Sequence, residues 1–124
     1  MIRLQIMGET PAKKNSKVIT KSGAIIPSER YREWHKSAMQ QIDAQCHVVT
    51  PIEKECCIKM VFYHGDKRRR DSDNGASSIL DLLCDSRILS DDKWEIVRKL
   101  QIENEYDKNM ARCIIEISPY DLEL

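Results

Sequence analysis

The alternation of apolar and polar residues predicts four strands along the chain. Residues 1–7 carry apolar side chains at every second position, as in a strand with one buried face. Residues 55–63 (ECCIKMVFY) are apolar on both faces, which favours a central strand that is covered on both sides. A strand that begins at Trp94 alternates again, and residues 112–118 follow it after a turn. These last two strands are expected to form a β-hairpin.

Two helices are predicted between these strands. Residues 29–45 place apolar side chains three and four positions apart, and Ser28 stands at the N-cap position. A shorter helix is predicted within residues 74–86, where Asp73 is well placed to cap the N-terminus. Before the first helix, residues 8–27 contain two prolines, two glycines and four lysines. They are expected to form a long basic loop with a short strand near its end.

The predicted order is therefore β-α-β-α-β-β, an α+β fold in which two helices accompany a small mixed β-sheet. A chain of 124 residues is large enough for one hydrophobic core and too small for two, so residues 1–124 are expected to form a single domain. No segment approaches the roughly 18 consecutive apolar residues that a membrane span requires, and the N-terminus lacks the apolar region of a signal peptide. The protein is therefore expected to be cytoplasmic and to have no membrane partner.

The chain contains five cysteines, an odd number without any CxxC pair, which is typical of free thiols in a reducing compartment. Such thiols behave as small buried hydrophobic side chains. A zinc site is the alternative, and its ligands would come from Cys46, His47, Cys56, Cys57 and His64. Because adjacent Cys-Cys and Cys-His pairs are poor spacings for tetrahedral coordination, free thiols are the favoured interpretation.

The formal net charge is zero, which excludes a polycation that binds nucleic acid through its overall charge. The charge is unevenly distributed, however. Residues 1–40 contain eight Lys/Arg and three Glu, a net charge of +5, whereas residues 101–124 contain two Lys/Arg and six acids, a net charge of −4. This asymmetry indicates one electropositive surface.

The segment KRRRDSDN, residues 67–74, sets four cations directly against two aspartates. In an extended segment Asp71 and Asp73 project to the same side, so both carboxylates can face one point. Asp91 and Asp92 stand at the start of the next predicted strand, and pairing of that strand with the central one would bring a second acidic pair beside the first. Clustered carboxylates repel one another, and a Mg²⁺ ion among them removes the repulsion and accepts phosphate oxygens as further ligands. The pattern predicts a metal-dependent hydrolase of phosphodiesters, in which the cations grip the flanking phosphates.

The alternative for the same segment is a solvated turn in which arginine and aspartate side chains pair with each other. Surface pairs of this kind contribute only about 0–1 kcal/mol each. The chain would then be a small α+β interaction module, and four aspartates at two strand ends would have no explanation.

The combination of KRRRDSDN, the helix SSILDLLCDSRI and the segment LSDDKWEIV resembles the core of the RusA family of Holliday-junction resolvases, which occur in bacteria and their phages. The earlier segments PAKKNSK and IIPSERYREW resemble the N-terminal half of phage-type members, so the resemblance spans roughly residues 10–105. It implies a homodimeric, Mg²⁺-dependent endonuclease that nicks two opposing strands of a four-way DNA junction in recombination and repair. It also implies a bacterial or prophage origin.

Carried over residue by residue, the resemblance implies metal-binding, catalytic carboxylates at Asp71, Asp73 and Asp92, with Asp91 as a further metal ligand beside them. Mg²⁺ is the expected ion, Mn²⁺ is its expected substitute, and no small-molecule cofactor is expected. Branched DNA and a second copy of the chain are the expected partners. The residues expected to contact DNA are Lys13, Lys14, Lys17, Lys67, Arg68, Arg69, Arg70 and Asn74.

One position departs from the family pattern. Members often carry a lysine four residues after the second aspartate of the D-x-D-N motif, and Ser77 stands there in this chain. A cation at this position stabilises the charge that develops on the scissile phosphate. A junction-binding protein that kept the fold and lost turnover is therefore the alternative function. If turnover is kept, the cation would come from Lys13, Lys14, Lys17 or Lys93.

Overall fold

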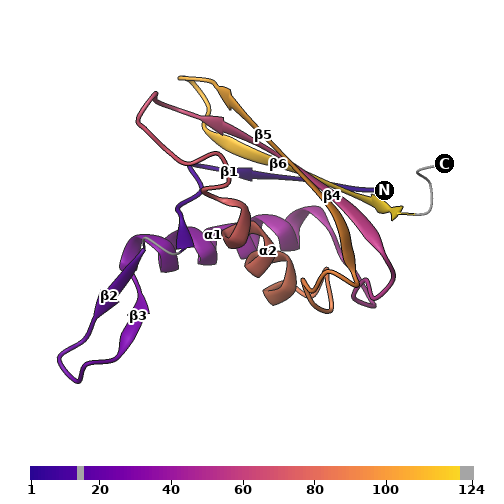
Figure 1. The fold of residues 1–124 in the computed structure, drawn as a ribbon, viewed down its shortest axis with the longest axis horizontal. Coiled ribbons are helices and arrows are strands. Elements are labelled where there is room, and N and C mark those ends of the chain that lie inside the picture. The colour runs from indigo at the N-terminus through magenta and orange to yellow at the C-terminus, as the bar shows by residue number, and fades with distance from the viewer. Residues whose placement is uncertain (14–15, 121–124) are drawn as a thin grey trace.

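The structure, a computed structural model, describes residues 1–13 and 16–120. It is a single small domain with one mixed sheet and two helices, as the sequence predicts (Figure 1). The long loop before the first helix adds a small hairpin to the predicted order. The elements are β1 (Ile2–Met7), β2 (Lys17–Ile19), β3 (Ile25–Pro27), α1 (Glu29–Gln45), β4 (Cys56–His64), α2 (Ala76–Asp85), β5 (Val97–Tyr106) and β6 (Arg112–Pro119).

The main sheet has the strand order β1-β6-β4-β5, in which β4 runs parallel to β5 and antiparallel to β6. The predicted hairpin between the last two strands is therefore wrong, because β5 and β6 lie on opposite edges of β4. The chain passes over the end of β4 between them, and the Asp107 N–H donates to the His64 carbonyl oxygen at 2.9 Å. This arrangement gives β4, which has more buried residues than any other described strand, a hydrogen-bonded neighbour on both edges.

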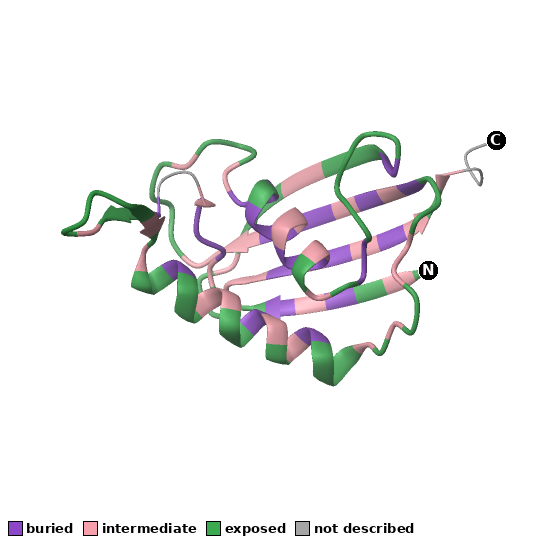
Figure 2. Cartoon of the chain, turned by 90° about the horizontal axis from the view of Figure 1, so that it is seen from below, coloured by how far each residue is buried: buried purple, intermediate pink, exposed green. Residues whose placement is uncertain are grey.

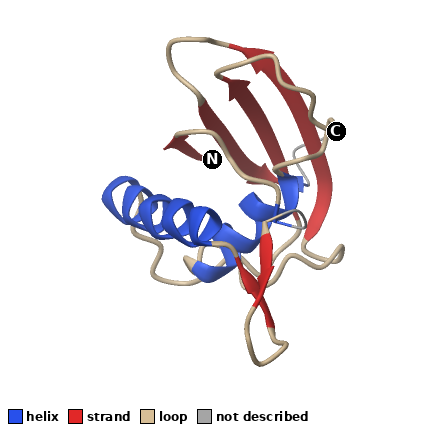
Figure 3. Cartoon of the chain, turned by 90° about the vertical axis from the view of Figure 1, so that its left-hand side faces the viewer, coloured by secondary structure: helices blue, strands red, loops and turns tan. Residues whose placement is uncertain are grey.

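Both helices cover the same face of the sheet (Figure 3). Buried residues alternate along the strands on this face, as Figure 2 shows, and they form one core with the inward sides of α1 and α2. On the other face β4 presents Cys57, Lys59 and Tyr63, which are only half-buried. The prediction that β4 is covered on both sides is therefore wrong for the single chain. Ion pairs that include Lys59–Glu103 at 3.8 Å make this open face polar.

The N-terminus of α1 is capped as predicted, because the Ser28 hydroxyl accepts a hydrogen bond from the Tyr31 N–H at 3.2 Å. The predicted cap of α2 is wrong. That helix begins at Ala76 with Gly75 at the N-cap position, and no side chain caps it, so Asp73 lies outside the cap. A Cβ atom at Gly75 would lie 2.7 Å from the ring of Phe62, so glycine allows the start of α2 to sit directly on the end of β4.

The strand β5 begins later than predicted. Trp94 and the two residues after it form a turn, and Trp94 is 71% exposed instead of alternating into the core. The register of β4 against β5 shifts between Cys56 and Cys57, so that Arg98 is an extra residue in β5. Such a bulge resets the alternation. Val97 before it is buried and Ile102 after it packs against the core, whereas Leu100 is 40% exposed.

The hairpin formed by β2 and β3 extends away from the body of the domain (Figure 1). Its apolar side chains are largely exposed, with Ile19 at 75% and Ile25 at 67%. We call residues 17–27 the projecting hairpin. Within the described part of the chain, neither helix has the length and apolar character that crossing a membrane would need.

Candidate functional site

The acidic motif lies on the loop that joins β4 to α2. Asp71 and Asp73 are both exposed there, in consecutive turns closed by the Asn74 N–H to the Asp71 carbonyl and the Ala76 N–H to the Asp73 carbonyl, each at 3.1 Å. Because the Asp73 carboxylate does not cap α2, it can face a ligand that approaches from solvent. The loop therefore presents two carboxylates on the surface at the end of the central strand.

The second acidic pair lies at the other end of α2. Asp91 and Asp92 are exposed in the loop that follows this helix, and the Asp92 N–H donates to the Asp91 carboxylate at 2.7 Å. Their charges reach the last turn of α2, where burial and then Asp92 and Asp91 raise the pKa of the Cys84 thiol to about 11. The pair precedes a turn rather than standing at the start of β5.

The predicted gathering of four carboxylates is not found within one chain. The ten residues of α2 span about 15 Å and separate the two loops, which lie at opposite ends of that helix in Figure 1. The cause is the parallel pairing of β4 and β5, since the segment that enters β5 must lie at the opposite end from the loop that leaves β4. The roles of Asp71, Asp73, Asp91 and Asp92 as metal ligands stay predictions.

Among the described residues, three potential metal ligands do come together, namely His35, Asp81 and Asp85. One possible ligand atom of each residue lies within 4.8 Å of those of the other two. It lies between α1 and α2, where the His35 Nε2 is 2.8 Å from the Asp85 Oδ2. The Lys13 Nζ lies 3.0 Å from the Asp81 Oδ1, and the Tyr31 hydroxyl donates to the other oxygen at 3.4 Å. These carboxylates are therefore already engaged by cationic and hydroxyl groups.

The tyrosine of this group is electrostatically coupled to its aspartate. Burial, and then the negative charge of Asp81, raises the pKa of Tyr31 to about 12, so the hydroxyl keeps its proton and acts as a donor. This cluster was not predicted from the sequence. Its signal was a spacing of four residues on each helix, between Tyr31 and His35 and between Asp81 and Asp85, but only the contact between the helices reveals it.

The basic run before the aspartates divides into two parts. Arg70 points inward, its side chain is 13% exposed, and it pairs with Glu9 at 3.2 Å and Asp66 at 3.0 Å. Arg68 is 72% exposed, and Arg69 is exposed and forms no ion pair with another described residue. Arg70 therefore fits the alternative of an internal salt bridge. Arg69 can meet an external anion directly, whereas Arg68 already lies 3.6 Å from the Asp66 carboxylate.

A network of hydrogen bonds holds the acidic loop against the ends of β4 and β5. The ring of His64 lies between Glu9, whose Oε2 is 2.7 Å from Nδ1, and Asn104, whose Oδ1 is 2.8 Å from Nε2. The Asn104 amide in turn donates to the carbonyl oxygen of Ser72, between the two aspartates, at 2.8 Å. This network ties the acidic motif to β5 and was not foreseen from the sequence.

The same network removes the zinc alternative. His64 is committed to Glu9 and Asn104, and no three of the candidate zinc ligands come close enough to one another to share an ion, although all of them belong to the described residues. The five cysteines are free, as expected.

The remaining residues expected to contact DNA lie on several elements. Lys67 lies over the ring of Tyr106, 4.8 Å from its centroid, beside a hollow of about 470 Å³ that the acidic loop and the end of β5 line. Lys17 is exposed on β2, and Asn74 is half-buried. Lys13 is engaged by the carboxylate cluster between the helices, and Lys14 lies outside the described residues.

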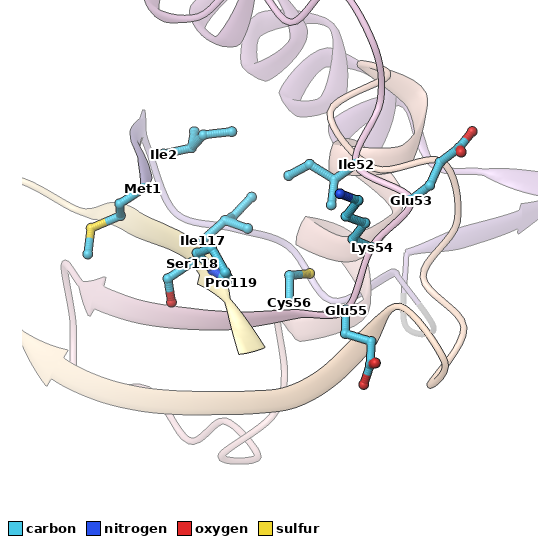
Figure 4. A pocket seen from close by; sticks show the side chains of 10 residues that line it. All are labelled: Met1, Ile2, Ile52, Glu53, Lys54, Glu55, Cys56, Ile117, Ser118 and Pro119. Carbon is cyan, nitrogen blue, oxygen red and sulfur yellow. The ribbon is translucent and has the colours of Figure 1, made fainter. Parts of the chain in front are cut away.

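A cavity of about 850 Å³ lies at the other end of the sheet (Figure 4). It is lined by apolar side chains such as Ile2, Ile52 and Ile117, and the carboxylates of Glu53 and Glu55 point away from it in Figure 4. It does not bring polar groups together, so the acidic loop is the better candidate for chemistry.

Comparison with known proteins identifies the family. A search of curated proteins finds no match. The family described as Endodeoxyribonuclease RusA matches residues 8–118, which include both acidic pairs, the basic run and both helices. The fold, the acidic loop and this match over nearly the whole length show that the chain belongs to the RusA family of endodeoxyribonucleases, which resolve Holliday junctions.

Proposed function

We propose that this protein is a Mg²⁺-dependent endonuclease that acts as a homodimer and makes paired, symmetric nicks in a four-way DNA junction. The observation that carries the proposal is the acidic loop. It exposes two carboxylates beside exposed arginines, and a half-buried network holds it against the end of the central strand.

The residues of the loop fit a divalent ion. Nucleases of this family generally depend on a divalent metal, and Mg²⁺ is commonly held by one or two carboxylates while substrate phosphate oxygens complete its ligands. Asp71 and Asp73 supply such a pair in an exposed position. A bound ion would activate a water molecule and neutralise charge on the phosphate. The chain's own contribution is to hold these carboxylates in place and to grip the flanking phosphates with Arg68 and Arg69.

A second copy of the chain supplies the third carboxylate in this proposal. Asp92 is exposed, and α2 separates it from Asp71 of the same chain, so a two-fold arrangement in which Asp92 of one copy lies beside Asp71 of the other would complete two equivalent sites. The projecting hairpin, with Ile19 and Ile25 exposed, supports such an association because it offers apolar surface away from the body. Two sites related by a two-fold axis match the symmetry of a four-way junction.

The direct test is an assay with a labelled four-way junction and a matched linear duplex. We expect the wild-type protein to nick the junction at symmetric positions in Mg²⁺, and to leave the duplex intact. Removal of Mg²⁺ with a chelator should stop cleavage, and Mn²⁺ should restore it. Equal cleavage of duplex and junction would contradict the proposed selectivity, and cleavage that persists in excess chelator would contradict the metal dependence.

The division of the basic run gives a second test. Each phosphate that a protein neutralises contributes about 0.9 to the slope of log K against log salt, so Arg69→Ala should flatten the slope for junction binding by about that amount. Arg70→Ala should instead destabilise the fold by about 1–3 kcal/mol, because it removes the charged partner of the half-buried Glu9 carboxylate. The measurements are a salt titration and a thermal melt of both variants. If instead Arg70→Ala flattened the salt slope and Arg69→Ala lowered the melting temperature, Arg69 rather than Arg70 would be the residue that stabilises the fold.

The alternative is a junction-binding protein without turnover, and the observation in its favour is Ser77. The structure places this residue exposed in the first turn of α2, next to the acidic loop, where it brings no charge to a bound phosphate. Binding of the junction without cleavage in Mg²⁺ or Mn²⁺ would support this alternative. In that event Ser77→Lys should create measurable cleavage.

A further inference from the structure

Trp94 presents an exposed indole ring directly after the second acidic pair. It is 71% exposed and stands two positions after Asp92. The turn that carries it is closed by hydrogen bonds from the Ile96 and Val97 N–H groups to the Lys93 carbonyl oxygen, both at 3.0 Å. Ile96 is 5% exposed and anchors the turn in the core. The indole is therefore held at a defined place on the surface.

The side of this ring that faces the protein is supported by an arginine. The guanidinium carbon of Arg98 lies 5.7 Å from the centroid of the Trp94 ring and 4.6 Å from that of Tyr120. An ion pair with Glu55 fixes the guanidinium in this position. A cation over an aromatic face is attracted by the π-electrons of the ring, so the three side chains form an ordered stack. Most of the indole surface remains in contact with solvent.

A single exposed aromatic residue on a protein surface usually requires no explanation. Here its surroundings favour a nucleobase as the ligand. The chain belongs to a family of DNA endonucleases, the ring adjoins a carboxylate pair proposed to serve the cleavage site, and the guanidinium of Arg98 lies against the ring. Proteins that bind unpaired nucleotides use the same combination, since every base has a face that stacks on an aromatic ring or a guanidinium.

We propose that Trp94, backed by Arg98, is a stacking platform for one nucleobase that is unstacked at the branch point of the junction. The inference rests on the proposed function and deepens it, because it names a residue that distinguishes a junction from a duplex. In a continuous duplex both faces of each base are covered by its neighbours, whereas a branch point offers a base with a free face. The platform would hold that strand beside the acidic pair.

Binding measurements test the platform directly. In Ca²⁺, which is used to permit binding without turnover, Trp94→Ala should weaken junction affinity about tenfold, the loss expected for one stacked base. Affinity for the matched duplex should change little. Trp94→Tyr should keep most of the junction affinity and Trp94→Leu should not, because leucine is apolar but cannot stack. Val49→Ala removes another exposed apolar side chain, 98% exposed, and is the matched control.

Fluorescence provides a readout that does not depend on cleavage. The chain has two tryptophans, so Trp34→Phe leaves Trp94 as the sole reporter. The junction should quench its emission and protect it from acrylamide, and the duplex should do so much less. The affinity series above is measured in the wild-type background, so it stands if Trp34→Phe folds poorly.

The outcomes separate this inference from the proposed function. If wild-type protein cuts the junction while Trp94→Ala binds it normally and the emission is unquenched, the platform is wrong and the nuclease stands. If the junction quenches Trp94 but is never cut, the platform is supported and the nuclease proposal fails. If Trp94→Ala sediments as a monomer where the wild type is a dimer, Trp94 packs against the second copy and the platform is overturned.

Discussion

Replacing Asp71 by asparagine is expected to abolish cleavage of a four-way junction and to leave its affinity for the junction equal or better. The opposite effects on cleavage and on affinity follow from the loss of one negative charge. In the proposed site the substitution removes a negative group beside the bound phosphate, which relieves repulsion, and it also removes a ligand of the proposed metal ion. We expect cleavage to fall by at least about 100-fold. Because the side chain is exposed, the melting temperature should change by less than about 3 °C.

The experiment is a gel-shift titration in Ca²⁺ beside a Mg²⁺ cleavage time course on the same junction. Asp43→Asn is the matched control, since it makes the same chemical change at an exposed position near the end of α1 and should alter neither activity. Parallel loss of binding and cleavage together with a lowered melting temperature would show that Asp71 has a structural role. Intact cleavage by Asp71→Asn would refute the proposed metal site.

An equal mixture of the Asp71→Asn and Asp92→Asn variants is expected to recover cleavage that neither variant has alone. In the proposed dimer each site combines Asp71 of one copy with Asp92 of the other. A mixed dimer then has one site with both substitutions and one site with neither. Random exchange makes half of the dimers mixed, so about a quarter of all sites should be intact. The restored product should be a junction with a single nick, because the second site of each mixed dimer carries both substitutions and is inactive.

The control for this mixture is Asp71→Asn with Asp73→Asn. Both residues lie on the same loop, so in a mixed dimer each site still carries one substitution and no recovery is expected. Subunit exchange is checked by sedimentation of differently labelled variants. If exchange occurs and the first mixture still fails to cut, Asp92 does not complete the site of the partner. A monomer at micromolar concentration, with or without DNA, would contradict the dimer itself.

The elements of the fold were largely predictable because they depend on local patterns. The alternation in β1, the Ser28 cap of α1 and the apolar character of β4 each involve residues that are close in sequence, and each appears in the structure. The motif that we propose for cleavage was also local, since D-x-D-N after a basic run requires only a short stretch of chain. The pairing of strands was not local. Two strands joined by a short turn usually form a hairpin, but here β4 takes the place between them.

Patterns along the chain were therefore sufficient to predict the two helices, the main strands, the mixed sheet and the membership of a nuclease family. The surroundings of individual side chains, in contrast, depend on how distant segments pack together. The parallel pairing of β4 and β5 separates Asp92 from Asp71, and a half-buried carboxylate turns Arg70 inward while Arg69 stays in solvent. A turn ahead of β5 leaves Trp94 outside the core. These outcomes depend on contacts between segments that are far apart in the chain. The free energies of such contacts cannot be inferred from a local sequence pattern.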